Sequence, residues 1–175
     1  MPLISTVWIK RNLRAFLLVV LLAVALDQIS KFAVVGMLDP FDPPREIIGS
    51  LIRFKLAFNP YGVFSIQFGP PALYYILSLL GIIAFILIGL SQTRRLAVVV
   101  WGLIIGGAIG NFIDRVRMHY VVDFIDMGIG SHRWYVYNLA DAFISVGVVF
   151  LLVQELFWKK PAPDNAGPER REVKP

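Results

Sequence analysis

Four long apolar runs constrain this chain more than any other feature of its sequence. They cover residues 15–35, 72–90, 96–113 and 142–158. An α-helix rises about 1.5 Å per residue, so about 20 apolar residues cross a hydrocarbon core of about 30 Å. Only 17% of the residues are charged, against about 25% in a soluble domain. The sequence therefore predicts an all-α integral membrane protein with four transmembrane helices.

The rest of the chain is too short for a separate soluble domain. The connections between the apolar runs are brief, so residues 1–158 are predicted to form a single four-helix transmembrane domain. Residues 159–175 are rich in proline and charge and hold only one large apolar residue, Val173. Such a segment cannot bury apolar surface, which predicts a disordered cytoplasmic tail.

The basic residues are distributed unevenly around the runs. Ten lie before the first run, between the second and third, or after the fourth; six lie in the two other connections, and Lys31 lies within the first run. Basic residues accumulate on the cytoplasmic side of a membrane. Both termini are therefore predicted to be cytoplasmic, and the net charge of +5 reflects this topology. We expect no nucleic-acid partner.

The outer connection between the first two runs has the pattern of a strand. Apolar and other residues alternate over 52–58 and again over 63–68, with the turn-forming sequence Asn59-Pro60-Tyr61-Gly62 between them. We predict a small antiparallel β element at about 36–70 that rests on the outer membrane surface.

Charged residues inside an apolar run are costly and often functional. Asp27 and Lys31 stand four apart on one helical face and can form an ion pair. A purely structural pair, with Lys31 extending toward the membrane surface, explains Lys31 as well as a functional role does. Asp27 lies close to the centre of the run, which favours a functional or site-supporting role for it.

The third run ends in a glycine stripe followed by a polar cluster. Gly102, Gly106 and Gly110 recur every four residues, which permits close approach of another helix. Next to this stripe, an amide, a carboxylate and a guanidinium lie together at one end of the helix, namely Asn111, Asp114 and Arg115. They indicate either part of a functional site or simple helix capping with an arginine that extends to the membrane surface.

More acids follow at the same membrane face. Asp123 lies among apolar residues, and Asn138 and Asp141 stand three apart at the start of the fourth run. Taken alone, the last two are typical of a helix N-terminus. Because they lie at the same membrane face as Asp114 and Asp123, a catalytic role is favoured instead. Two neighbouring carboxylates can divide the roles of acid and base around one water molecule. This is the aspartyl-peptidase arrangement.

The sequence gives little indication of a cysteine-based or a zinc-based catalytic centre. The chain has no cysteine, which excludes disulfides and thiolate chemistry. His119 and His132 are too far apart in sequence to indicate a zinc pair, and no HExxH motif is present. We therefore expect no metal and no cofactor.

Five stretches resemble, in order, the motifs of the bacterial lipoprotein signal peptidases, the type II signal peptidases. The resemblance extends from about residue 25 to residue 145, and its most specific part is the combination of the third and fifth stretches. The stretches are Asp27-Gln28-x-x-Lys31, Asn59 with Gly62 and Phe64, GGAIGNFIDR at 106–115, VVDF at 121–124, and YNLAD at 137–141.

The resemblance implies a membrane aspartyl endopeptidase that cuts diacylglyceryl-modified prolipoproteins just before the lipidated cysteine. It would lie in the bacterial cytoplasmic (inner) membrane with its active site at the outer leaflet, in contact with membrane lipid; we expect a monomer. The residues matching Asp123 and Asp141 form the catalytic dyad in that family. Substrate binding or support of the site is implied for Asp27, Lys31, Asn59, Gly62, Asn111, Asp114, Arg115 and Asn138.

In such a dyad one carboxylate takes a proton from water while the other, protonated, polarises the scissile carbonyl. Which acid has which role stays open at this point, because coupled acids titrate as a pair. One departure from the family pattern is that Gly62 stands one position later than usual, after Pro60, which restricts Asn59 to extended conformations. A small proton-coupled transporter or assembly factor, with Asp27, Lys31 and Asp114 as a relay, is the alternative function.

Overall fold

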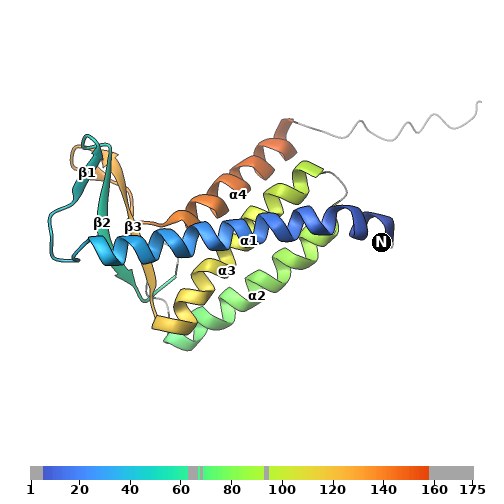
Figure 1. Ribbon diagram of the computed structural model, residues 1–175, viewed down its shortest axis with the longest axis horizontal. Coiled ribbons are helices and arrows are strands. Elements are labelled where there is room, and N and C mark those ends of the chain that lie inside the picture. Colours follow the sequence, from blue (N-terminus) through green and yellow to red (C-terminus); the bar gives the residue numbers. More distant parts are fainter. Residues whose placement is uncertain (1–5, 63–66, 68, 93–94, 158–175) are drawn as a thin grey trace, which may run out of the picture.

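The computed structural model describes residues 6–62, 67, 69–92 and 95–157. Four helices dominate it, and each is long and apolar enough to cross a membrane (Figure 1). This confirms the predicted fold class. The helices are α1 (Thr6–Met37), α2 (Pro71–Leu90), α3 (Arg95–Met118) and α4 (Leu139–Phe157).

Helix α3 is the centre of the bundle. In its most apolar stretch 61% of the residues are buried, against 28% or less in the other three helices. Glycines allow this contact: a Cβ on Gly106 would lie 2.6 Å from the Cβ of Ala23 in α1, and one on Gly107 would overlap the Ala140 carbonyl of α4. The predicted glycine stripe thus faces α1, and close van der Waals packing can hold the helices together within lipid.

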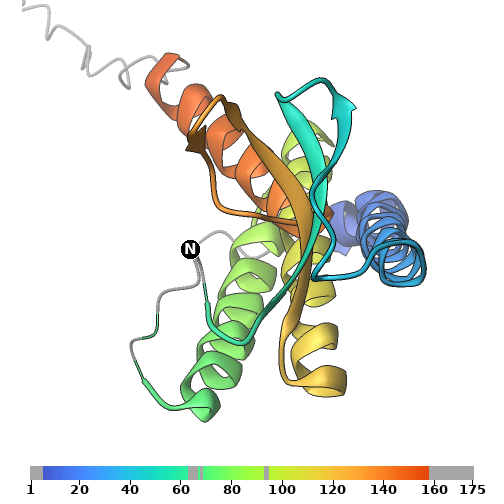
Figure 2. The same cartoon turned by 90° about the vertical axis from the view of Figure 1, so that its left-hand side faces the viewer.

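A four-stranded antiparallel sheet lies across one end of the helices (Figures 1 and 2). Its order is β1-β2-β3-β4, and the β2–β3 pairing extends from Ile52 opposite Met127 to Asn59 opposite Val121. The start of α1 and the end of α4 lie at the opposite end of the bundle. The strands are β1 (Arg45–Ile48), β2 (Ile52–Asn59), β3 (Val121–Ile129) and β4 (His132–Arg133).

The sheet is larger than the predicted β element. Strand β2 matches the predicted strand at 52–58, but its partners are β1 and β3, and β3 comes from the connection between α3 and α4. The first four residues of β3 are buried on both faces, so they lack the alternation that identifies a half-exposed strand. The second predicted strand, at 63–68, lies outside the described residues except for Gln67.

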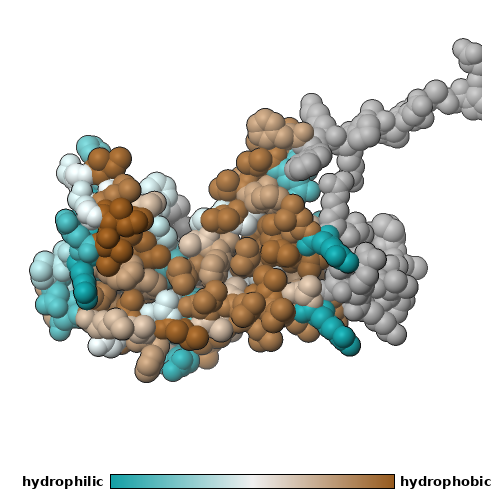
Figure 3. All heavy atoms as spheres, turned by 45° about the horizontal axis from the view of Figure 1, so that its top comes forward, coloured by the Kyte–Doolittle hydropathy of each residue, from teal (hydrophilic) through white to brown (hydrophobic). Residues whose placement is uncertain are grey.

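A second apolar cluster attaches the sheet to the helices. Leu56 of β2 and Val122 and Phe124 of β3 pack with Val34 near the end of α1. Apolar side chains cover the helical part of the surface. Polar side chains lie along the outer edge of the sheet, beside an exposed apolar patch, and again toward the far helical ends (Figure 3). The sheet is therefore placed where an aqueous surface meets the apolar bundle.

Candidate active site

Asn138 connects the two acids of the predicted dyad. Its side-chain Nδ2 donates to Asp123 Oδ1 at 2.7 Å, and its Oδ1 accepts from the backbone nitrogen of Asp141 at 2.9 Å. Its own backbone nitrogen makes a longer contact of 3.4 Å with Asp141 Oδ2. The start of α4 and strand β3 are thus joined through one fully buried amide.

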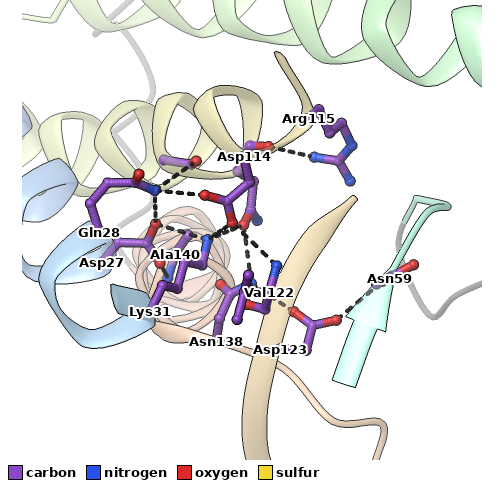
Figure 4. A network of polar contacts seen from close by, with 12 residues as sticks. Asp27, Gln28, Lys31, Asn59, Asp114, Arg115, Val122, Asp123, Asn138 and Ala140 are labelled. Atoms are coloured by element: carbon purple, nitrogen blue, oxygen red, sulfur yellow. Dashed lines mark hydrogen bonds and ion pairs between the residues drawn. The ribbon is translucent and has the colours of Figure 1, made fainter. Parts of the chain in front are cut away.

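Two further asparagines donate to these acids. Asn111 on α3 donates through Nδ2 to Asp141 Oδ1 at 2.8 Å. Asn59 at the end of β2 donates through Nδ2 to Asp123 Oδ2 at 3.2 Å, so that Asp123 lies between Asn59 and Asn138 (Figure 4). Both oxygens of Asp123 therefore accept hydrogen bonds from amide groups.

The sequence around Asn59 explains how this side chain is aimed. Pro60 restricts Asn59 to the extended conformation, which is the one it has as the last residue of β2. Its Oδ1 then accepts from Tyr61 N at 3.0 Å, and its Nδ2 also donates to Gly62 O at 3.3 Å. The shifted glycine is thus compatible with an asparagine that reaches Asp123.

Neighbouring donors fix the orientation of each amide. The Oδ1 of Asn59 and of Asn138 accepts from a backbone N–H, and the Oδ1 of Asn111 accepts from Lys31 Nζ at 2.9 Å. A backbone N–H and a lysine ammonium can only donate, so each amide must direct its NH₂ group toward an acid. Through these three amides, Asp123 and Asp141 therefore meet hydrogen-bond donors and no hydrogen-bond acceptors.

No lysine or arginine nitrogen forms an ion pair with Asp123 or Asp141 in the part of the chain that the structure describes. Burial raises the pKa of Asp123 to about 7, and the negative charge of Asp141 contributes to the increase. Hydrogen bonds from Asn59 and Asn138 oppose it only in part. Asp123 can therefore hold or release a proton near neutral pH.

A second polar network lies behind the asparagines. Lys31 Nζ forms ion pairs with Asp27 Oδ2 at 2.9 Å, as predicted, and with Asp114 Oδ2 at 2.8 Å (Figure 4). Gln28 donates to Asp114 Oδ1 at 2.9 Å. All three charged side chains are buried. The bundle thus holds one cation between two acids.

This network also holds the backbone on either side of the dyad. Asp27 Oδ1 accepts from Ala140 N at 3.0 Å, next to Asp141, and Asp114 Oδ2 accepts from Val122 N at 3.2 Å, next to Asp123. Each contact connects a span of the bundle to the residue just before a dyad acid. Asp27 and Asp114 therefore hold the backbone next to Asp141 and Asp123 through these two hydrogen bonds.

Arg115 faces the acids from α3 without forming an ion pair with them. Its Nη1 donates to Asn111 O and its Nη2 to Tyr61 O, both at 3.1 Å. Its Nε is buried and has no hydrogen-bond partner among the described residues. The side chain thus spans from α3 to the turn after β2, beside a cavity.

That cavity has a volume of about 940 Å³ and lies between α2, α4 and the sheet. Its polar lining is concentrated at one end, and the remainder of the wall is mainly apolar. The polar end is formed by Asn59, Asn111, Arg115, Asp123 and Asp141. The acids therefore face a space large enough for a substrate.

Neither histidine joins the acids. His119 Nδ1 lies 2.7 Å from the Tyr75 hydroxyl, and His132 belongs to β4. Across the described residues, no group of three or more His, Asp or Glu side chains is arranged to hold a metal ion.

Comparison with known proteins decides the family. The sequence pattern of the family described as Signal peptidase (SPase) II matches residues 19–157. The chain belongs to the signal peptidase II family. It is 36% identical over 140 residues to the lipoprotein signal peptidase of Listeria monocytogenes serotype 4b (strain CLIP80459), a match that covers 79% of this chain and 90% of that protein.

One further relative and two solved structures are also similar to this chain. The lipoprotein signal peptidase of Syntrophus aciditrophicus (strain SB) is 33% identical over 151 residues, covering 82% of this chain and 93% of the relative. A bacterial membrane enzyme solved in meso at 2.3 Å resolution is similar with a TM-score of 0.74 and 27% identity, over 85% of this chain and 93% of that one. A second such structure, at 1.9 Å, has a TM-score of 0.73 and 26% identity, over 83% and 94% of the two chains.

The sequence of this signal peptidase II chain left several contacts unpredicted. Gln28 donates to Asp114, which is 86 residues away in the sequence. Asp114 pairs with Lys31 and not with the adjacent Arg115. The backbone donors at Val122 and Ala140 have no sequence signal, because every residue except proline carries the same N–H group.

Proposed function

We propose that this chain cleaves prolipoproteins with Asp123 and Asp141 as an aspartyl dyad. Membership of the signal peptidase II family makes it a protease that removes signal peptides from prolipoproteins. It also decides against the transporter alternative. The observation that carries the dyad is that, among the described residues, the hydrogen-bond donors to these two acids are amide groups, and that both acids line the cavity.

In the proposed reaction Asp123 begins protonated and Asp141 ionised. Asp141 takes a proton from a water molecule, the water oxygen attacks the scissile carbonyl carbon, and Asp123 gives its proton to the carbonyl oxygen. Collapse of the intermediate breaks the C–N bond, and the proton held by Asp141 passes to the leaving amine. The ionised Asp123 takes back a proton from a hydroxyl group of the intermediate, which becomes the new carbonyl, so that both acids return to their starting states. The raised pKa of Asp123, about 7, supports this division of roles.

The three asparagines and Arg115 support this chemistry without taking a proton. The amide donors hold the carboxylate planes in place while the proton moves, which lowers the cost of reorganisation. Arg115, which reaches Tyr61 O on the turn after β2, places positive charge beside the cavity where the carbonyl oxygen becomes negative. It would therefore orient the substrate carbonyl.

The substrate is proposed to be a prolipoprotein that carries a diacylglyceryl group on its cysteine. A lipid-anchored cysteine presents the scissile bond at the membrane surface. Asp123 belongs to β3 and Asp141 to the first turn of α4, so the dyad lies where the sheet meets the bundle. Buried acyl chains would supply binding energy of about 0.8 kcal/mol per CH₂. The cut falls just before this cysteine.

The proposed topology places both termini in the cytoplasm and the sheet outside the bacterial inner membrane, with the chain acting as a monomer. Reporter fusions within 91–96 should report cytoplasm, and fusions within 40–62 should report the outer side. A cytoplasmic signal from 40–62 would place the dyad on the wrong side of the membrane and contradict the proposal.

Cleavage by the purified protein in detergent tests the activity itself. A synthetic peptide with a diacylglyceryl cysteine should be cut before that cysteine, and the unmodified peptide should be cut far more slowly. Cleavage should continue in excess EDTA, because carboxylates alone are proposed to activate the water. Loss of activity that added zinc restores would overturn the aspartyl mechanism.

A further inference from the structure

The cavity beside the dyad extends far into the bilayer. On α2 its lining extends from Tyr74 to Phe85, which at 1.5 Å per residue is a length of about 17 Å. One leaflet contributes half of a hydrocarbon core of about 30 Å, or about 15 Å. The cavity therefore has the depth of a single layer of acyl chains, measured from the end where the acids lie.

The inner end of this cavity is closed by contacts of α2 and α4 with α3. A Cβ on Gly89 would lie 3.2 Å from the Cβ of Trp101, so α2 contacts α3 directly one turn below Phe85. On the other side, a Cβ on Gly147 would overlap the side chain of Ile104. The Phe85 ring packs on Trp101, with 6.0 Å between the ring centroids. Phe85 therefore lines the inner end of the cavity and forms its floor, with Trp101 packed behind it.

The lining of the cavity fits lipid chains. The cavity has a volume of about 940 Å³, and its wall away from the acids is mainly apolar. Its polar end and apolar shaft also match a ligand whose polar head carries flexible apolar tails.

We infer that Phe85, packed on Trp101, sets the length of acyl chain that the enzyme accepts on its diacylglyceryl substrate. Chains that reach the floor lie along the apolar wall of the cavity, whereas longer chains must bend out between α2 and α4. This inference rests on the proposed function, because it assigns the cavity to the lipid part of the same substrate.

Gly81 offers a way to shorten the cavity. It lines the cavity wall midway along α2, and a Cβ added there meets no atom within 4 Å. A leucine at this position therefore fits without a backbone clash and fills part of the shaft. Phe85→Ala has the opposite effect and deepens the shaft.

The test compares lipopeptides with one peptide sequence and dimyristoyl, dipalmitoyl or diarachidoyl glyceryl groups. The wild-type protein should favour the dipalmitoyl over the diarachidoyl substrate by at least about tenfold in kcat/KM, since a single methylene in a pocket can change this ratio by about 10–200-fold. Phe85→Ala should bring the two within about twofold of each other. Gly81→Leu should shift the preference to the dimyristoyl substrate.

Two lipid-side changes serve as matched controls. Leu87, two residues from Phe85 on the same helix, is 65% exposed, and Gly36 near the end of α1 has open space around it. Leu87→Ala and Gly36→Leu should keep the wild-type ratios. Thermal unfolding in detergent checks that each variant is folded; if Phe85→Ala is not, Gly81→Leu alone decides the question.

The outcomes separate this inference from the function on which it rests. If the wild-type protein cuts no diacylated lipopeptide, the proposed function fails. If it cuts all three equally and neither variant changes the ratios, the function stands and the chain-length role is overturned. A variant that slows all three substrates by the same factor also overturns it, because the cavity would then hold another part of the substrate.

Discussion

Strand β3 carries two buried acids, three residues apart, that are held in opposite ways. Asp126 accepts hydrogen bonds from Arg53 Nε and Arg133 Nε, each at 2.9 Å. Burial acts to raise its pKa, but the hydrogen bonds and charges of the two arginines outweigh burial and keep this pKa below its usual range. Asp123 contacts amides instead, and its pKa is raised to about 7.

The difference teaches what converts a buried acid into a group that can exchange protons. A cation in contact fixes a carboxylate in its charged form, as Arg53 and Arg133 do for Asp126. Amide donors satisfy the hydrogen bonds of a carboxylate without supplying a full charge, so Asp123 can still be neutral. Lys31 likewise forms ion pairs with Asp27 and Asp114. The structure thus separates the acids that contact a cation from a pair, Asp123 and Asp141, that contacts amides.

The largest expected effect comes from removing either member of that pair. Asp123→Asn and Asp141→Asn should each lower kcat by about 10²–10⁴-fold, because the acid or the base is lost. The double variant should be hardly worse than either single one, since residues that act as a unit are not additive. Cleavage of a diacylated lipopeptide measures this, with Asp126→Asn as the matched control on the same strand.

A particular result would reassign the dyad. If Asp123→Asn retains normal turnover while a folded Asp114→Asn variant is inactive, then the catalytic dyad consists of Asp114 and Asp141.

The next largest effect concerns the cation of the buried network. Lys31→Met leaves Asp27 and Asp114 buried without a counter-charge, which should cost about 3–5 kcal/mol of stability. Asp114→Asn leaves the Asp27–Lys31 pair neutral, so it should cost only about 1–2 kcal/mol and retain some activity. Thermal unfolding in detergent compares the two variants. Equal losses would show that charge balance does not explain the network.

A smaller effect is a pH-dependent gain in stability for Asp123→Asn. The folded-state pKa of Asp123, about 7, lies above its ordinary value of 3.8, so the acid stabilises the fold when protonated and costs stability as pH rises through 7. Above pH 7, Asp123→Asn should raise the free energy of unfolding by up to about 4 kcal/mol, because the asparagine carries no buried charge. The loss of one hydrogen bond should reduce this gain by about 1 kcal/mol.

Unfolding curves across pH test this gain. The advantage of Asp123→Asn over the wild-type protein should shrink toward pH 4 and be largest above pH 7. An advantage that is the same at every pH would contradict the raised pKa. The activity of the wild-type protein should fall above pH 7 for the same reason, because the proposed acid loses its proton.

The smallest effect is expected at the cation-held acid. Asp126→Asn should lower stability by about 1–3 kcal/mol and leave kcat/KM within about threefold, because Asp126 lies outside the cavity lining. The pKa of Asp126 is lowered, so its stabilisation is present at neutral pH and lost as pH falls toward the folded-state value. A large loss of turnover in a folded Asp126→Asn variant would remove the contrast between the two acids.

The helical part of the fold could be predicted because the bilayer imposes a strong local rule. Spans must be apolar over about 20 residues, and the four runs were visible for this reason. The Asp27–Lys31 pair was also predictable, since residues four apart on a helix are neighbours. Strand β3 was not predicted, because burial on both faces removed its alternation.

The candidate site was predicted only as a set of residue types. Motif resemblance selected Asp123 and Asp141, and the local spacing placed Asn138 with Asp141. Spacing did not indicate that Asp114 would pair with Lys31, because these residues are 83 positions apart and belong to different helices. Arg115 is adjacent to Asp114 in the sequence, but the ion pair of Asp114 is with Lys31.

The sequence by itself determined the number of spans, the membrane class and the residues from which a site could be built, because each depends on neighbours along the chain. The tertiary structure alone decided which acids meet a cation and which meet only amides. That distinction depends on contacts such as Asn59 with Asp123, 64 residues apart, and Ala140 N with Asp27, 113 residues apart. The pKa of a carboxyl group responds to such neighbours in space, so the chemistry of the acids became visible only in the folded chain.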